Sequence, residues 1–131
     1  MRLLVDTHVL LWWLADDRKL AKSARAIIAN PDNDVLVSAA SLWEISIKVA
    51  LGRLEVELDD LEQNIATTGF RSLAINYRHA LIAGRLPAIH RDPFDRMLIA
   101  QASVEELRVV SHDRVFERYS LSAEGLPPVI V

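Results

Sequence analysis

The chain has 131 residues, and 51% of them are hydrophobic, which is enough for one domain with a packed core and for a buried contact between subunits. It contains no cysteine. This excludes disulfides and cysteine-based zinc sites, so any metal must be held by oxygen or imidazole ligands. The formal net charge of −3 argues against a surface that binds nucleic acid everywhere, although a local basic patch is compatible with it.

The apolar N-terminus is predicted to be neither a signal peptide nor a membrane span. Asp6 and His8 interrupt the apolar run. The stretch that remains, 9–15, is short, and an acidic pair follows it. We therefore expect a cytoplasmic protein, and the lack of cysteine fits that compartment.

Apolar runs, caps and stop signals predict strands and helices that alternate along the chain. The expected strands are, in order, 2–5, 34–38, 70–75, 108–111 and, at a border of the sheet, 127–131. The expected helices are 8–14 with Thr7 as N-cap, 21–29, 41–52, 59–68, 77–83 and 93–105, followed by a helical turn at 114–118. Because several strands are continuously apolar, both faces of the sheet must be covered. This predicts an α/β fold, a three-layer α/β/α domain with a central parallel sheet of four to five strands.

Four acidic residues fall where such a sheet carries its binding sites, at the carboxyl ends of parallel strands. Asp6 directly ends the first strand, and Asp113 lies two residues beyond the fourth. Glu44 and Asp95 stand near the N-termini of the helices that follow the second strand and precede the fourth. We therefore expect these carboxylates, from four separate segments, to converge at one edge of the sheet.

A cluster of carboxylates points to a divalent cation, because the cation relieves the repulsion between the negative charges. Oxygen ligands in a chain without cysteine suit Mg²⁺ or Mn²⁺. These ions serve phosphoryl chemistry, in which they hold the phosphate, generate the nucleophile and stabilise the leaving oxygen. The candidate catalytic and metal-binding residues are therefore Asp6, Glu44, Asp95 and Asp113.

Each acid also has an ordinary structural interpretation, which the sequence leaves open. Asp6 and Asp113 could each cap the helical segment that follows them. Glu44 has Lys48 one turn later, and such a pair is usually a solvated salt bridge. Glu44 also borders the predicted apolar face of its helix, which comprises Trp43, Ile47, Ala50 and Leu51.

The segment HRDPFDRMLIAQA, residues 90–102, carries two acids with different expected roles. Proline is favoured at the first position of a helix, so Pro93 makes Asp92 the expected N-cap. Asp95 is then the third helical residue, and its spacing places it on the buried face with Leu98. A carboxylate on that face is costly unless it is paired, hydrogen-bonded or bound to a metal, so Asp95 is assigned to the site.

Four stretches together resemble the PIN-domain family, and more closely the VapC-type toxins of type II toxin–antitoxin systems. They are LLVDTH, SLWEISIKVALGRL, DPFDRMLIAQA and VVSHDRVF, and in this order they span essentially the whole chain. The resemblance implies a PIN-like fold and an Mg²⁺- or Mn²⁺-dependent endoribonuclease, with tRNA or rRNA as the expected substrate.

The resemblance also implies how the four acids divide the work. Asp6 and Asp95 match the direct metal ligands of the family. Glu44 and Asp113 would bind the ion through water, hold a second ion or orient the attacking water.

Residues beside the acids in the sequence are candidates for supporting roles. Ser111 stands where the family usually has a serine or threonine whose hydroxyl supports the site, and Thr7 would orient Asp6 or contact the substrate. Candidates for contacts with RNA phosphates are Lys48, Arg91, Arg96 and Arg114. The alternative for each arginine is a surface charge or an ion pair. The four histidines lack the spacing of helical metal sites, and we interpret them as surface or loop residues: His8, His79, His90 and His112.

A homodimer and a cognate VapB-type antitoxin are the partners that the resemblance implies. The C-terminal segment of such an antitoxin typically wraps the toxin and blocks its acidic site. Three tryptophans bear on these contacts. Trp43 lies on the predicted buried face of its helix and is assigned to the core, whereas Trp12 and Trp13 point in different directions, so that one of them could be left for a partner.

Other functional classes require different residue patterns. A response-regulator receiver domain needs an acidic pair after strand one, an aspartate after strand three and a lysine after the last strand. Here the first strand ends in Asp6-Thr7, the third ends near Ile75-Asn76, and no lysine follows Lys48, so that class is excluded. Two alternatives stay open: a PIN-fold nuclease in RNA processing outside a toxin–antitoxin system, and an inactive PIN-fold protein-binding module.

Overall fold

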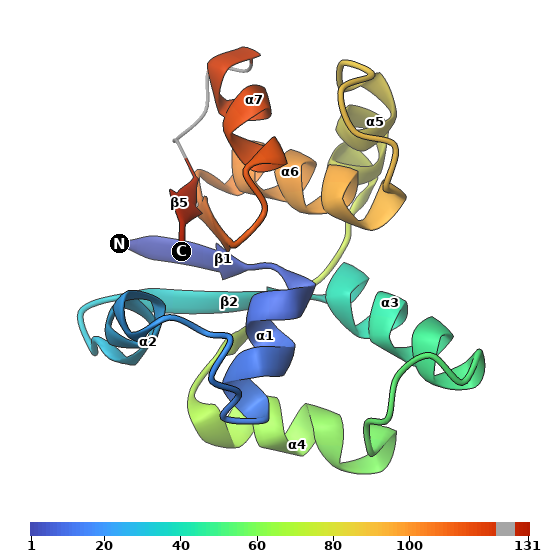
Figure 1. Cartoon of the computed structure of the whole chain (residues 1–131). Coiled ribbons are helices and arrows are strands. Elements are labelled where there is room, and N and C mark those ends of the chain that lie inside the picture. The colour runs from blue at the N-terminus through green and yellow to red at the C-terminus, as the bar shows by residue number, and fades with distance from the viewer. Residues whose placement is uncertain (123–127) are drawn as a thin grey trace.

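The computed structural model describes residues 1–122 and 128–131, and at its centre lies a sheet of five strands (Figure 1). The strands are β1 (Arg2–Val5), β2 (Asp34–Ser38), β3 (Arg71–Leu73), β4 (Arg108–Ser111) and β5 (Val129–Ile130). They lie in the order β3-β2-β1-β4-β5, and each neighbouring pair is parallel. The expected parallel sheet is confirmed, and β5 is an edge strand as expected, although residue 127 of the expected segment lies outside the described residues.

The helices of the described residues are α1 (Thr7–Leu14), α2 (Lys22–Ala29), α3 (Ala39–Ala50), α4 (Leu58–Thr68), α5 (Tyr77–Arg85), α6 (Pro93–Glu105) and α7 (Val115–Ser122). The bounds of α6 and β4 are those that the sequence predicted. The predicted turn at 114–118 is instead the beginning of the longer helix α7, which buries Phe116 and Tyr119.

The buried face of α3 differs from the predicted one. The residues that face inward are Ala40, Ser41, Glu44 and Ile45, whereas the side chains of Trp43 and Leu51 are each 61% exposed. Ser38 caps the helix by accepting a hydrogen bond from the Ala40 amide (3.0 Å), which moves its start two residues toward the N-terminus. Ser41 and Glu44 face Thr7 of α1, and Ile45 packs in the core with α1, α2 and α4. The assignment of Trp43 to the core is therefore wrong.

Each face of the sheet has its own hydrophobic core, and β1 contributes to both. Leu3 and Val5 pack with residues of α1, α2 and α4, whereas Leu4 packs on the other face with residues of α6 and α7. Figure 1 shows these two groups of helices on opposite sides of the sheet. Fully burying one such aliphatic side chain contributes roughly 1.5–3 kcal/mol, so the central strand is held firmly from both sides. The expected three-layer arrangement is confirmed.

Strand register brings the carboxyl ends of the central strands level with one another. Val5, the last residue of β1, is paired with Val37 of β2 and with Val110 of β4. The residues that follow these strands therefore emerge at one edge. They include Asp6 after β1, the helix α3 after β2, and Asp113 after β4.

A buried polar link ties α6 to this edge. The Ser38 hydroxyl donates to Gln101 Oε1 (2.5 Å), and Gln101 Nε2 donates to the carbonyl oxygen of Ala74 (3.3 Å). Ser38 and Gln101 are both fully buried. The link therefore fixes the helix that carries Asp95 relative to the start of the helix that carries Glu44.

Replacing Gln101 with leucine, which has a similar volume, is expected to lower the free energy of unfolding by roughly 1–3 kcal/mol, because two buried groups lose a partner. Urea unfolding measures this change. Gln63→Leu on the exposed surface of α4 is the control, with an expected change within about 0.5 kcal/mol. Equal stability of Gln101→Leu and the wild type would contradict the link.

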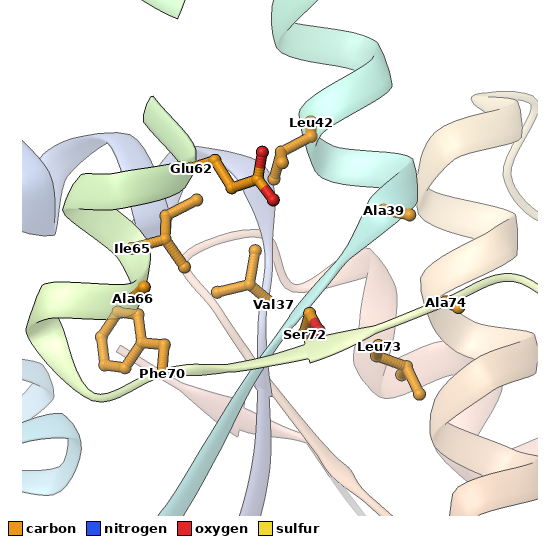
Figure 2. Close-up of a pocket in the computed structure, with 10 residues that line it drawn as sticks. All are labelled: Val37, Ala39, Leu42, Glu62, Ile65, Ala66, Phe70, Ser72, Leu73 and Ala74. Atoms are coloured by element: carbon orange, nitrogen blue, oxygen red, sulfur yellow. The ribbon is translucent and has the colours of Figure 1, made fainter. Parts of the chain in front are cut away.

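An apolar pocket of about 310 Å³ lies between α3, α4 and the edge strand β3 (Figure 2). Its lining includes Leu42, Ile65 and Phe70, with Glu62 as a lone acid. None of the four candidate acids lines it, so the pocket is separate from the candidate site. Among the described residues, no helix is long and apolar enough to cross a membrane.

Candidate functional site

Asp6 has two structural tasks at the end of β1. Its Oδ1 accepts a hydrogen bond from the Val9 amide (2.9 Å), which makes Asp6 the N-cap of α1. Its Oδ2 accepts a hydrogen bond from the Ser111 hydroxyl (2.5 Å) at the end of β4. The side chain is 4% exposed, and this burial raises its pKa above the ordinary value. The prediction of Thr7 as the cap of α1 is therefore wrong, and Ser111 does support Asp6.

Thr7 contacts Glu44 rather than Asp6. Its hydroxyl donates to Glu44 Oε1 (2.7 Å) and lies 3.0 Å from the Ser41 hydroxyl oxygen. Lys48 Nζ donates to the other oxygen, Glu44 Oε2 (2.6 Å). Because Glu44 is only 4% exposed, the interpretation of the pair as a solvated salt bridge is wrong. The ammonium instead neutralises a buried carboxylate, which is costly to leave unpaired.

Asp92 and Asp95 have the positions in α6 that the sequence predicted: Asp92 is the N-cap and Asp95 is in the first turn. Asp92 Oδ1 accepts hydrogen bonds from the amides of Phe94 (2.8 Å) and Asp95 (3.4 Å), so it is the N-cap of α6. Asp95 lies in the first turn and faces the other acids. Burial raises its pKa to about 6; a hydrogen bond with His90 acts in the opposite direction, and the charges of Asp92 and Asp6 add to the rise.

Asp92→Asn is expected to change the free energy of unfolding by less than about 0.5 kcal/mol, because asparagine caps helices about as well as aspartate. Asp92→Ala is the matched variant and is expected to cost about 1 kcal/mol. Chemical denaturation compares the two. A loss in Asp92→Asn as large as in Asp92→Ala would show that Asp92 does more than cap α6.

Asp113 stands at the loop between β4 and α7. Its Oδ1 accepts a hydrogen bond from the Val115 amide (2.9 Å), and its own amide donates to the Ser111 hydroxyl oxygen (2.9 Å). The capping interpretation of Asp113 is therefore correct for α7. Ser111 connects the two acids, since its hydroxyl lies between the Asp113 amide and the Asp6 carboxylate.

His90 was missed by the sequence interpretation, which assigned it to the surface. Its Nε2 lies 2.7 Å from Asp95 Oδ2, and its side chain is 24% exposed. One potential ligand atom from each of His90, Asp95 and Asp113 lies within 4.8 Å of the other two. The signal available in the sequence was its position in the loop just ahead of α6, five residues before Asp95.

His79 is also misassigned, since it is fully buried. Its Nδ1 accepts a hydrogen bond from the Asn76 amide (3.2 Å), and its Nε2 lies 2.9 Å from Glu105 Oε1. It joins α5 to α6 and has a structural role. His8 and His112 are exposed as expected.

Arg96 does not face the acids. Its guanidinium donates to the carbonyl oxygens of Ala83 (2.9 Å), Leu86 (3.0 Å), Pro87 (3.0 Å) and His90 (3.2 Å). The prediction that Arg96 contacts phosphate is wrong, because these carbonyl groups already occupy its donors. Of the other cations, Arg91 is exposed, and Arg114 forms an exposed ion pair with Glu117 (3.1 Å).

Trp43 packs on the outside of the molecule, beside the start of α6. Its ring meets that of Phe94 edge-on, with 5.4 Å between centroids. Both rings line an apolar pocket of about 270 Å³ between α3, α5 and α6. Trp12 and Trp13 are both partly buried against the core under α1.

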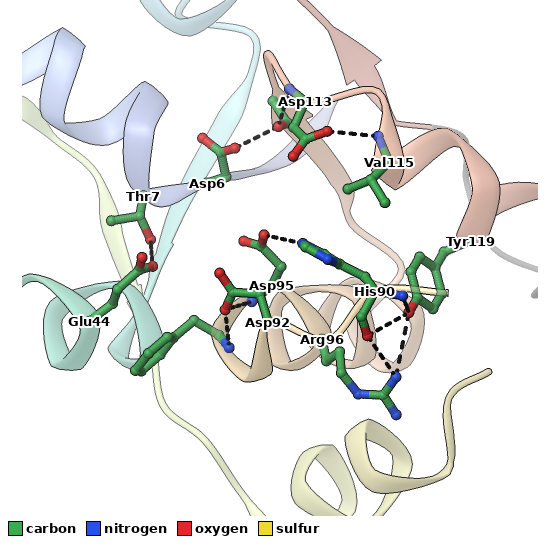
Figure 3. Close-up of polar contacts among 12 residues, drawn as sticks. Asp6, Thr7, Glu44, His90, Asp92, Asp95, Arg96, Asp113, Val115 and Tyr119 are labelled. Carbon is green, nitrogen blue, oxygen red and sulfur yellow. Dashed lines mark hydrogen bonds and ion pairs between the residues drawn. The ribbon is translucent and has the colours of Figure 1, made fainter. Parts of the chain in front are cut away.

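Figure 3 shows the carboxylates of Asp6, Asp95 and Asp113 turned toward one space, with Glu44 on its far side. The charges of Asp6 and Asp113 act on each other, as do those of Asp95 and Asp6. Carboxylate and imidazole ligands gathered in this way, with two of the acids largely out of water, fit a divalent cation that binds oxygen and nitrogen. Three of the four expected acids therefore lie around one space at this edge, whereas Glu44 lies apart from them and is held by Thr7 and Lys48.

Comparison with known proteins agrees with this fold and shows the family. The sequence model of the PIN domain matches residues 3–121. The chain is 31% identical over 114 residues to Ribonuclease VapC22 of Mycobacterium tuberculosis (strain ATCC 25618 / H37Rv), a match that covers 85% of this chain and 86% of that protein.

Solved structures share the fold. One is VapBC-5 from Mycobacterium tuberculosis, a member of the VapBC family of toxin–antitoxin systems, with a TM-score of 0.63, 20% identity, and coverage of 99% of this chain and 98% of that one. Another is FitAcB from Neisseria gonorrhoeae, with a TM-score of 0.65, 21% identity, and coverage of 98% and 96%. From the family match and the mycobacterial ribonuclease together, the chain belongs to the PIN-domain family, among its VapC-type members.

Proposed function

We propose that this protein is a metal-dependent endoribonuclease and the toxin component of a VapBC-type toxin–antitoxin system. The observation that carries the proposal is the meeting of three acids from separate segments, Asp6, Asp95 and Asp113, at one edge of the sheet, with Glu44 on the far side of the same space (Figure 3). Two of them, Asp6 and Asp95, are buried enough for their pKa values to rise. Caps explain single acids, but like charges brought close together repel and burial penalises them, so the cluster as a whole is best explained by a bound cation.

The chain's own residues would hold and orient the reacting groups. Asp6, Asp95 and Asp113 would hold Mg²⁺ or Mn²⁺, and Ser111 would keep the Asp6 carboxylate in place. When bound, the ion would supply charge stabilisation at the phosphate and a nucleophilic water at neutral pH. Glu44 would orient the attacking water or contact the ion through water, since Thr7 and Lys48 hold both of its oxygens.

RNA is the proposed substrate because the mycobacterial relative is named a ribonuclease. Arg91 is exposed and Arg114 lies in an exposed ion pair, and exposed cations of this kind contact phosphates. Lys48, which is paired with Glu44, would add positive charge behind the acids. A tRNA or rRNA site is the proposed target. Cleavage would be hydrolysis of a phosphodiester bond.

A VapB-type antitoxin and a second copy of the chain are the proposed partners. Several solved relatives are toxin–antitoxin complexes, among them VapBC-5. Large apolar side chains stay exposed on this chain, including Trp43 (61%), Leu81 (62%) and Tyr77 (91%). Aromatic side chains of this kind are enriched at protein interfaces.

Controlled expression in a bacterial host tests the toxin role. We expect growth to stop on induction, and discrete fragments of a structured RNA to accumulate. Co-expression of the protein encoded by a small upstream reading frame should restore growth. Asp95→Asn is the control and should not arrest growth at the same protein level.

Two outcomes would redirect the proposal. Normal growth with the wild type, together with RNA cleavage in vitro, would favour a PIN-fold nuclease in RNA processing. Normal growth without any cleavage would favour an inactive protein-binding module, which the intact acid set argues against.

A further inference from the structure

His90 is held in place by the loop that carries it, residues 86–92 between α5 and α6. Its backbone amide donates to the Tyr119 hydroxyl oxygen (2.7 Å), and its carbonyl oxygen accepts from Arg96 (3.2 Å). The same two side chains donate to the Pro87 carbonyl oxygen, each at 3.0 Å. Tyr119 is buried in the hydrophobic core that Leu4 forms with residues of α6 and α7. Side chains of two helices, α6 and α7, therefore hold the backbone of this loop in place, and Figure 3 shows their bonds to His90.

The imidazole of His90 projects from this loop toward the acids. Its Nε2 lies 2.7 Å from Asp95 Oδ2. One potential ligand atom from each of His90, Asp95 and Asp113 lies within 4.8 Å of the other two. Ligands about 2.1 Å from one ion lie about 3 Å apart when adjacent and about 4.2 Å apart when opposite. Movements of less than about 1 Å would therefore let one ion bind all three groups.

We propose that His90 is a direct nitrogen ligand of the divalent cation in this site, beside Asp95 and Asp113. The inference rests on the proposed function, because it concerns the same ion. For Nε2 to bind the ion, the imidazole would be in its neutral form with the proton on Nδ1, and Asp95 would be an ionised carboxylate. An imidazole among carboxylates favours Mn²⁺ over Mg²⁺, because Mg²⁺ prefers ligands that are all oxygen.

The alternative is that His90 acts only through Asp95, by holding that carboxylate with a hydrogen bond. That role would require contact with Asp95 alone. The position of the ring within reach of Asp113 as well favours coordination. Arg96 and Tyr119 would then be positioning residues, since they hold the His90 backbone without reaching the ion.

Pulsed electron paramagnetic resonance of Mn²⁺ bound to protein labelled with ¹⁵N at histidine tests this coordination. The wild type is expected to show the hyperfine coupling of a directly bound imidazole nitrogen. His90→Gln should lose that coupling. His8→Gln is the matched control, because His8 is an exposed histidine near Asp6, and it should keep the coupling.

Mn²⁺ affinity, measured by calorimetry, gives a second result. Loss of an outer-sphere partner typically weakens metal binding about 10–100-fold, so His90→Gln should weaken it at least tenfold, with a smaller loss for Mg²⁺. Tyr119→Phe should keep the nitrogen coupling at weaker affinity, because only the loop anchor is lost. Unfolding of each variant without metal checks that it is folded.

The outcomes separate this inference from the proposed function. Mn²⁺ binding without nitrogen coupling in the wild type, or with coupling that persists in His90→Gln, would overturn the role of His90 and leave the acidic site intact. A coupling lost only in His8→Gln would do the same. Absence of Mn²⁺ binding to the wild type would overturn both.

Discussion

Asp95→Asn is expected to lower the rate of RNA cleavage by about a hundredfold or more, with little change in the overall fold. A metal ligand contributes several kcal/mol to stabilising the transition state, and each 1.4 kcal/mol corresponds to about a tenfold change in rate. Asparagine keeps the shape of the side chain and one oxygen, but it loses the charge that would hold the ion. The measurement is single-turnover cleavage of a structured RNA in the presence of Mn²⁺.

Asp92→Asn is the matched control for this experiment. It lies three residues earlier in the same turn, removes the same charge and is expected to keep most of the activity because it only caps α6. Asp6→Asn should behave as Asp95→Asn does. If Asp92→Asn lost as much activity as Asp95→Asn, the division of roles between the two acids would be wrong.

The second large effect concerns stability without metal. The pKa of Asp95 is about 6 in the folded protein, whereas an aspartate in the unfolded chain has the ordinary pKa of 3.8. The folded state therefore holds the proton more tightly, so the free energy of unfolding falls as the pH rises through this interval. Above pH 6 the buried charge costs up to about 3 kcal/mol.

Asp95→Asn removes that charge. At pH 7 in EDTA, the free energy of unfolding of this variant, measured with urea, should therefore exceed that of the wild type by roughly 1–3 kcal/mol. At pH 4 the advantage should disappear, because Asp95 is then protonated in the folded state. Saturating Mn²⁺ should stabilise the wild type and leave the variant nearly unchanged. A variant less stable than the wild type at pH 7, or a gain that persists at pH 4, would contradict this electrostatic cost.

Local features of the sequence predicted the parts of the site that local rules control. Proline at the first turn and the three-residue spacing separate Asp92 from Asp95, and the structure gives α6 the predicted bounds. Asp6 and Asp113 follow buried strands, so the parallel sheet alone brings them together. In the first case a single segment of sequence is sufficient to assign the roles. In the second, the rule that parallel strands end at one edge of the sheet is sufficient to predict that the two acids meet.

The rest depends on contacts between distant segments. His90 reaches the acids because its loop is held by Tyr119, 29 residues later, whose hydroxyl oxygen accepts a hydrogen bond from the His90 amide. Arg96 binds carbonyl oxygens of that loop, which a pattern of residue types does not reveal. The buried face of α3 was predicted wrongly because two stripes of residues compete along it, and contacts with Thr7 of α1 place Ser41 and Glu44 inside rather than Trp43.

Cleavage of RNA by protein freed of metal is the most direct test of the central claim, that the acids act through a divalent cation. The purified chain is treated with EDTA, transferred to metal-free buffer and mixed with a structured RNA before and after addition of Mn²⁺. We expect no cleavage without the ion, its return with Mn²⁺, and no return for Asp95→Asn prepared in parallel. Cleavage by the wild type that continues unchanged in EDTA would contradict the claim.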